Sequence, residues 1–364
     1  MINPYNPSFG RKPERFLGRD IVVHEILSAL ENRNSPWRTT LLVGVRGSGK
    51  TALLNQLSES VNSNDCIVVS VIPGNDILNE VLSQLYSKIP KSIIKSIPKP
   101  SKLTIAGAVE LDISSDKPYF LNNFRYQITI MLNELKKKKL KVLFLIDESQ
   151  KHSEGMRTLV ATYQHLISEE FDVFLVMAGL PNVISDILND DVLTFLRRAN
   201  QVILDNVDLS LVKHDYEETF LDKYNVPNET LSKAARITQG YPYLIQLVGF
   251  YLWEFLQSDT PLEQLLDRVV VQAKAMMFLN VHKLLYRELS AGDKEFVNAM
   301  AVDNNGSKFA DIISRTGKSK NHLSSYRLRL IDYGYIKAVG HGEVAFCLPF
   351  TKEFLQQETE FGEM

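Results

Sequence analysis

Residues 44–51 read Gly-Val-Arg-Gly-Ser-Gly-Lys-Thr, which is the GxxxxGK[ST] spacing of a phosphate-binding loop. An apolar run enters this segment and helix-forming residues leave it, as the motif requires. The glycines let main-chain N–H groups turn toward phosphate oxygens, and the following helix presents its positive end to the same anion. We therefore predict a nucleoside triphosphate site, in which Lys50 reaches the β- and γ-phosphates and the Thr51 hydroxyl binds Mg²⁺. The predicted nucleotide contacts here are Gly44, Val45, Arg46, Gly47, Ser48, Gly49, Lys50, Thr51 and Ala52.

A pair of acidic residues follows a second apolar run, about 95 residues further along the chain. Residues 142–146 are Val-Leu-Phe-Leu-Ile and lead to Asp147 and Glu148. The carboxyl end of a buried parallel strand faces the ligand crevice of an open α/β sheet. Asp147 would hold Mg²⁺, and Glu148 would orient and deprotonate a water that attacks the γ-phosphate. The alternative, an acidic strand end without chemistry, is disfavoured by the apolar strand and the spacing.

Two further features of the sequence each allow two interpretations. After the apolar run 173–177, Gly179 and Asn182 stand where a residue sensing the γ-phosphate could lie, or where the chain simply turns from strand to helix. Arg197 and Arg198 could stabilise the transition state on the γ-phosphate of a neighbouring subunit, or form a solvated pair at a helix end. If an arginine acts in this way, hydrolysis requires a homo-oligomer.

The segment Phe-Leu-Gly-Arg-Asp at residues 16–20 precedes the first predicted helix and would pass near the adenine. It adds Phe16, Gly18 and Arg19 to the candidate nucleotide contacts. By itself this signal is weak.

Composition limits the possible partners and compartments. The chain has 364 residues, 45% of them hydrophobic and 23% charged, which indicates a globular protein of two or three domains. Its net charge of −2 gives no overall attraction to nucleic acid or to a membrane surface. Without a membrane-spanning run or the apolar core of a signal peptide, we expect a cytoplasmic protein with no membrane partner. Cys66 and Cys347 are expected to be reduced thiols, and no zinc site is predicted.

The order of elements predicts an αβα parallel sheet, because short apolar strands at 40–43, 66–71, 141–146 and 173–177 alternate with helical segments. We expect an N-terminal arm at 1–15, wrapped on the first domain, and a nucleotide domain at 16–208. A Pro-rich stretch at 90–119 is interpreted as an insertion in that domain. Helices without strands predict a helical lid domain at 209–288.

The last segment, 289–364, contains three predicted helices and then two short strands around Gly340 and Gly342. This is the element order of a winged helix-turn-helix. Residues 306–341 contain seven Lys or Arg against two Asp. We therefore predict a double-stranded DNA contact, and the alternative is a winged helix that contacts protein. The candidate DNA-binding residues are Lys318, Lys320, Asn321, Ser324, Arg327 and Arg329.

Taken together, these motifs resemble the AAA+ ATPases of the initiator and STAND side of that superfamily, and most of all prokaryotic ATP-binding proteins with an origin-recognition-like ATPase domain. The resemblance rests on residues 16–20, 44–51 and 145–150, on Ala-Gly-Leu-Pro-Asn from residue 178, on Gly-Tyr-Pro-Tyr at 240–243, and on the winged helix. It implies an α/β P-loop fold with a helical lid, with Pro242 beside a bound ATP or ADP. The lid helix lacks the arginine that many relatives direct to the γ-phosphate, and a Gly-x-Pro is typical of STAND-like switches.

Two classes of function follow from this resemblance. One is a slow or partner-stimulated ATP hydrolase coupled to DNA binding, in replication initiation, transposition or a mobile element. The other is a signalling or defence switch whose winged helix contacts a protein partner. A P-loop phosphotransferase is disfavoured, because the chain has no evident acceptor-binding domain.

Overall fold

The computed structural model describes residues 2–8, 13–62, 65–95, 97, 123–148, 153–258, 260–304 and 306–362. Most of the predicted insertion at 90–119 lies outside this part of the chain. Contacts divide the chain into a sheet unit, Asp20–Val43 with Leu53–Ile203, and a helical unit, Met1–Arg19 with Gly44–Ala52 and Leu204–Met364.

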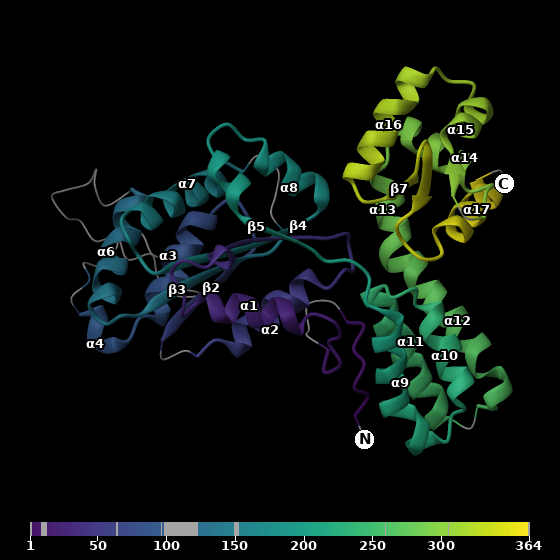
Figure 1. Ribbon diagram of the computed structural model, residues 1–364, viewed down its shortest axis with the longest axis horizontal. Coiled ribbons are helices and arrows are strands. Elements are labelled where there is room, and N and C mark those ends of the chain that lie inside the picture. Colours follow the sequence, from purple (N-terminus) through teal and green to yellow (C-terminus); the bar gives the residue numbers. More distant parts are fainter. Residues whose placement is uncertain are drawn as a thin grey trace. The chain divides into compact units, whose positions relative to one another are not determined.

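The sheet unit contains one parallel sheet of five strands in the order β2-β3-β4-β1-β5 (Figure 1). The predicted strands are all present, and β4 lies between β1 and β3. Because the strands are parallel, Val43, Ile146 and Gly179 end them at the same edge of the sheet. The strands are β1 (Thr39–Val43), β2 (Cys66–Val71), β3 (Lys141–Ile146), β4 (Val173–Gly179) and β5 (Asn200–Ile203).

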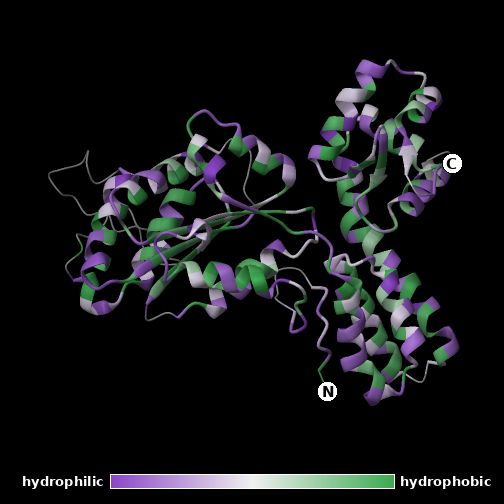
Figure 2. Cartoon of the chain, in the orientation of Figure 1, coloured by the Kyte–Doolittle hydropathy of each residue, from purple (hydrophilic) through white to green (hydrophobic). Residues whose placement is uncertain are grey.

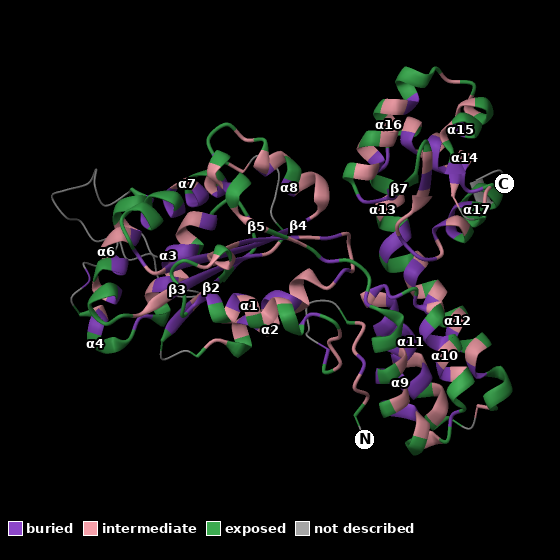
Figure 3. Cartoon of the chain, in the orientation of Figure 1, coloured by how far each residue is buried: buried purple, intermediate pink, exposed green. Residues whose placement is uncertain are grey.

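Helices cover both faces of this sheet, with α1 and α2 on one face and α3, α6 and α7 on the other (Figure 1). Alternate strand residues pack in opposite directions. Leu41, Phe144 and Leu175 share a core with α3, α6 and α7, and their equally buried neighbours point to the other face. The central strands β1, β3 and β4 are therefore mainly apolar (Figure 2) and buried (Figure 3), as the continuous apolar runs predicted, whereas the edge strand β5 is partly exposed. The helices are α1 (Asp20–Ala29), η1 (Pro36–Arg38), α2 (Lys50–Ser60), α3 (Ile77–Lys88), α4 (Lys91–Ile94), α6 (Phe124–Lys137), α7 (Glu154–Ser168), α8 (Pro181–Leu188) and η2 (Thr194–Arg198).

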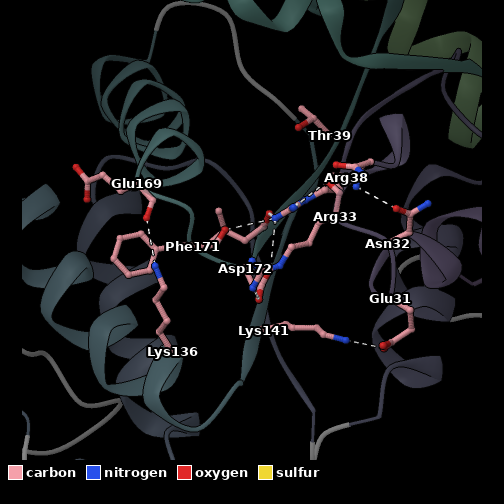
Figure 4. Close-up of polar contacts among 12 residues, drawn as sticks. Glu31, Asn32, Arg33, Arg38, Thr39, Lys136, Lys141, Glu169, Phe171 and Asp172 are labelled. Atoms are coloured by element: carbon pink, nitrogen blue, oxygen red, sulfur yellow. Dashed lines mark hydrogen bonds and ion pairs between the residues drawn. The ribbon is translucent and has the colours of Figure 1, made fainter.

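Paired charges fasten the opposite, amino-terminal edge of the sheet (Figure 4). Asp172, just before β4, bonds Arg33 at 2.5 Å and lies 3.8 Å from Arg38, which precedes β1. Lys141, the first residue of β3, pairs with Glu31 at 2.6 Å. These contacts tie the starts of three neighbouring strands together, and the carboxyl ends of the same strands carry the candidate site.

The helical unit begins with a bundle formed by α9 (Leu209–Tyr224), α10 (Asn228–Ile237), α11 (Pro242–Gln257), α12 (Leu262–Met277), η3 (Phe278–His282) and α13 (Lys283–Glu288). The N-terminal arm packs on this bundle, so its predicted place on the first domain is wrong. Tyr5 is 2% exposed, donates to Asp215 at 2.7 Å and stacks on Phe220. A side chain at Gly249 would overlap the Tyr5 ring, and the absence of one makes this packing possible.

The segment 261–288, in the predicted lid, contains one π-helical turn, η3, between α12 and α13. Its last residue, His282, is fully buried, donates from Nε2 to the carbonyl of Pro349 at 2.8 Å and stacks on Phe354. Burial lowers the pKa of His282 to about 4. The neutral imidazole thus joins the bundle to the C-terminal segment.

The C-terminal segment contains the three predicted helices and the predicted hairpin. A short strand, β6, adds a third member to the sheet, in the order β6-β8-β7, and a last helix, α17, follows the hairpin. Neither had been predicted. At the start of α14, Ser290 and Asp293 form a reciprocal capping box. The elements are α14 (Ala291–Met300), β6 (Ser307–Lys308), α15 (Phe309–Thr316), α16 (Lys320–Asp332), β7 (Ile336–Gly340), β8 (Glu343–Phe346) and α17 (Thr351–Gly362).

Candidate nucleotide site and C-terminal surface

The segment 44–49 is a loop that leaves β1 and enters α2, and its glycines are required by its shape. Gly47 and Gly49 have φ of 76° and 91°, a region that residues with side chains rarely adopt. A Cβ at Gly44 would overlap the Ser48 side chain, and a Cβ at Gly47 would overlap the hydroxyl of Tyr241. Left-handed residues inside a turn make consecutive N–H groups converge, which is the geometry of an anion nest.

Lys50 orients the first two peptide groups of the loop. Its ammonium donates to the carbonyls of Gly44 at 2.8 Å and Val45 at 2.9 Å. In a planar trans peptide, the N–H of the following residue points in the direction opposite to the carbonyl oxygen. The N–H groups of Val45 and Arg46 therefore point away from the contacts with the ammonium.

Two donors from distant segments orient the rest of the loop. The hydroxyl of Tyr241 donates to the Arg46 carbonyl at 2.5 Å. Arg19 makes a long hydrogen bond of 3.5 Å to the Ser48 carbonyl and a short one of 2.5 Å to the Asp205 carbonyl. By the same peptide geometry, the N–H of Gly47 points away from Tyr241 and the N–H of Gly49 points away from Arg19. Sequence reasoning had missed this bracing, although the Gly-Tyr-Pro-Tyr segment was its visible signal.

The predicted contacts Phe16, Gly18 and Pro242 lie in the same unit as the loop. A Cβ at Gly49 would lie 3.4 Å from the Phe16 ring, so this ring closes one side of the loop. Gly18 has a φ of 69°. Pro242 is the first residue of α11 and directly follows Tyr241. Arg19, predicted to contact nucleotide, is instead 8% exposed and bonded to main-chain carbonyls.

The acidic pair stands at the end of β3, as predicted. The N–H of Asp147 donates to the Val71 carbonyl at 3.0 Å, which continues the pairing with β2 by one residue. Glu148 follows with a φ of 49°, and its N–H donates to the Asp147 carboxylate at 2.9 Å. A left-handed glutamate stores backbone strain of the kind that is concentrated at functional sites.

The side-chain amide of Asn182 has a buried oxygen that lacks a hydrogen-bond partner among the described residues. Asn182 lies in the first turn of α8, just after β4, and its Oδ1 is buried. Buried amide oxygens are normally satisfied, so the amide is suited to a ligand or a water. Both readings of this position, phosphate sensor and plain turn, remain predictions.

Residues 15–176 match the family model described as an AAA ATPase domain. This part of the chain is similar to an AAA ATPase domain. A search of curated protein sequences finds no match.

Two solved structures share the wider fold of this chain. The Walker-type ATPase PABY2304 of Pyrococcus abyssi superposes with a TM-score of 0.65 at 18% identity, covering 95% of this chain and 97% of its own. Cdc6p from Pyrobaculum aerophilum superposes with a TM-score of 0.50 at 12% identity, covering 98% of this chain and 97% of its own. At these identities the similarity shows the fold alone, a parallel sheet with helices, and carries no residue roles.

Arg197 and Arg198 lie beyond the matched AAA ATPase domain, in η2 just before β5. Both are exposed. The Nε of Arg197 donates to the Leu188 carbonyl at 2.8 Å, which orients its guanidinium from the end of α8. The role of either arginine in a neighbouring subunit stays a prediction.

Residues 279–355, at the other end of the chain, match a family model described as a domain of unknown function, DUF8462. Several of the basic residues in this segment form ion pairs with Asp or Glu. Arg329 bonds Asp293, which is 1% exposed, through Nε and Nη2 at 2.6–3.1 Å. Lys318 pairs with Glu295, and Arg315 forms a two-pronged pair with Asp303. We therefore withdraw the predicted phosphate contact of Arg329, because its guanidinium neutralises a buried carboxylate.

The other predicted DNA contacts on α16 divide into exposed and engaged side chains. Lys320 and Asn321 are exposed in its first turn. Ser324 donates its hydroxyl to the Lys320 carbonyl at 2.8 Å. Arg327 lies over the Phe309 ring at 5.9 Å, with a buried Nε. Lys320 and Asn321 are thus the predicted contacts with the most accessible side chains.

None of the described helices combines the length and the apolar composition that crossing a bilayer requires.

Proposed function

We propose that this protein binds ATP and hydrolyses it slowly as a conformational switch. The observation that carries the proposal is the braced phosphate loop. Donors from Lys50, Tyr241 and Arg19 hold its carbonyl groups, which leaves main-chain N–H groups to bind phosphate oxygens. The AAA ATPase match across this segment supports the same activity.

The chain's donor set fits Mg²⁺, held by the Thr51 hydroxyl and the Asp147 carboxylate. Magnesium keeps several waters and uses one or two carboxylates together with substrate phosphates. Bound Mg²⁺ would supply neutralisation of the phosphate charge. Glu148 accepts a proton from the attacking water, and the arginine of a neighbouring subunit, Arg197 or Arg198, stabilises the charge that develops.

The domain division that we propose follows function: an arm at 1–15, an ATPase domain at 16–208, a helical lid at 209–288 and a winged helix at 289–364. In this division the lid contains Pro242 and Tyr241, and therefore one side of the nucleotide site.

We propose further that the winged helix binds double-stranded DNA and that the nucleotide state controls this binding, in initiation, transposition or a mobile element. The order of α14, α15, α16 and the β7–β8 hairpin supports this function, and so do the exposed Lys320 and Asn321 at the start of α16. The test is steady-state ATP hydrolysis with and without duplex DNA, at several salt concentrations. Stimulation by DNA that Glu148→Gln abolishes would support coupling of the two ends of the chain.

A second candidate, a signalling or defence switch that contacts protein, has its own support. Residues 290–341 contain eight Lys or Arg and five Asp or Glu, and the pairs described above consume part of this positive charge. Leu328 on α16 and Val339 on β7 are 60% and 48% exposed, which suits a protein interface. Turnover that is independent of DNA at every salt concentration would favour this function.

A further inference from the structure

Tyr241 connects the phosphate loop with the lid helix α11. Its side chain is fully buried, and its hydroxyl reaches the Arg46 carbonyl, 195 positions earlier in the chain. Burial raises the pKa of Tyr241 above its usual range. The hydroxyl therefore keeps its proton and acts as a donor at any working pH.

The turn between α10 and α11 holds Tyr241 rigidly. The N–H of Tyr241 donates to the Thr238 carbonyl at 2.9 Å, and the Gly240 carbonyl accepts from the N–H of Val207 at 2.7 Å. Gly240 has a φ of 73°, and a Cβ there would overlap the Val207 carbonyl. A donor on so constrained a backbone can hold one peptide group of the loop in one orientation.

The loop also approaches the lid through an exposed ion pair, which is a weaker connection. Arg46 Nη2 lies 3.9 Å from Glu288 in α13, and the two side chains are 41% and 66% exposed. Solvent-exposed pairs at this distance contribute little. Of these two polar contacts, the buried hydroxyl is therefore the one through which loop and lid can affect each other more strongly.

We propose that Tyr241 is a positioning residue for the nucleotide. Its hydroxyl fixes the Arg46–Gly47 peptide so that the N–H of Gly47 meets a phosphate oxygen, and phosphate binding is transmitted through the same bond to α11. This inference rests on the proposed ATP site. It assigns to Tyr241 a role that is exerted through a peptide group of the loop.

The test compares Tyr241→Phe with Tyr243→Phe in the full chain. Tyr243 stands on the same helix, and its hydroxyl accepts from Asn280 at 2.9 Å. The Kd for Mg-ADP is measured by titration calorimetry, and KM and kcat by ATP hydrolysis. Tyr241→Phe is expected to raise Kd and KM about two- to tenfold, the effect of one ordinary hydrogen bond, with kcat at saturation within about twofold. Tyr243→Phe is expected to leave Kd and KM unchanged.

Several results would overturn the inference. Unchanged Kd and KM in Tyr241→Phe would do so, even if its melting temperature fell, because a merely structural hydroxyl lowers stability without changing nucleotide affinity. An equal rise in Kd in both variants would show that the hydroxyl of Tyr241 has no special role. If the unmodified protein binds no ADP or ATP, the proposed function fails as well. Binding by the unmodified protein with no effect of Tyr241→Phe refutes this inference alone.

Amide hydrogen exchange tests the transmission to α11. Saturating Mg-ADP is expected to slow exchange at the start of α11 in the unmodified protein, and to slow it less in Tyr241→Phe at equal occupancy. Equal protection in both proteins would refute the coupling.

Discussion

Arg329→Met should destabilise the C-terminal segment, because it removes the partner of a buried charge. Asp293 is 1% exposed, while the Arg329 side chain is 37% exposed. Removing one partner of a fully buried pair costs roughly 3–5 kcal/mol, and the partly exposed guanidinium reduces this to about 3 kcal/mol. Methionine keeps the apolar stem of the side chain, while the charge is lost together with the contact of the guanidinium over the Tyr326 ring at 5.1 Å.

The assay is urea unfolding of the full chain. The free energy of unfolding is taken from the transition whose midpoint the substitution shifts. Lys337→Met is the matched control, because Lys337 is an exposed base in β7 and should cost less than about 0.5 kcal/mol. The double variant with Asp293→Asn should recover much of the loss, since no unpaired charge remains buried. A loss below about 1 kcal/mol for Arg329→Met would refute the reasoning, because it would show an ordinary surface pair and return Arg329 to the candidate DNA contacts.

Three further predictions concern the site and the junction. Glu148→Gln should lower ATP turnover by about 100-fold or more while the Kd for Mg-ADP stays within about twofold, because the carboxylate acts only on the attacking water; a large loss of ADP affinity would contradict this role. Gly47→Ala should abolish measurable ADP binding in calorimetry, because the added methyl overlaps Tyr241 and the φ of 76° disfavours a side chain; normal binding would show that the loop adapts. The pKa of His282 is lowered to about 4, so the unfolded chain binds more protons between pH 6.5 and 4, and stability must fall as pH falls through this window. We expect about 2 kcal/mol of loss between pH 7 and pH 5 from this residue, measured as the unfolding free energy relative to His282→Gln; identical pH profiles would refute it.

The sequence by itself determined the sheet and the identity of the chemical residues. Continuous apolar runs located four strands within two residues of their ends, because strands buried on both faces need apolar side chains at every position. The phosphate loop and the acidic pair were found from spacing, since their chemistry requires particular residues at particular offsets.

Tertiary structure decided which polar groups meet across long separations, and a linear pattern does not encode this. The arm packs on α9 and α11 because Tyr5 fits over Gly249. The basic count near α16 suggested a DNA surface, yet Arg329 was already paired with an aspartate 36 residues earlier. Tyr241 was visible only as a neighbour of Pro242, and the fold places its hydroxyl on the phosphate loop. Periodicity and motif spacing report short-range constraints, whereas the pairing of buried charges and hydroxyls depends on how separate segments pack together.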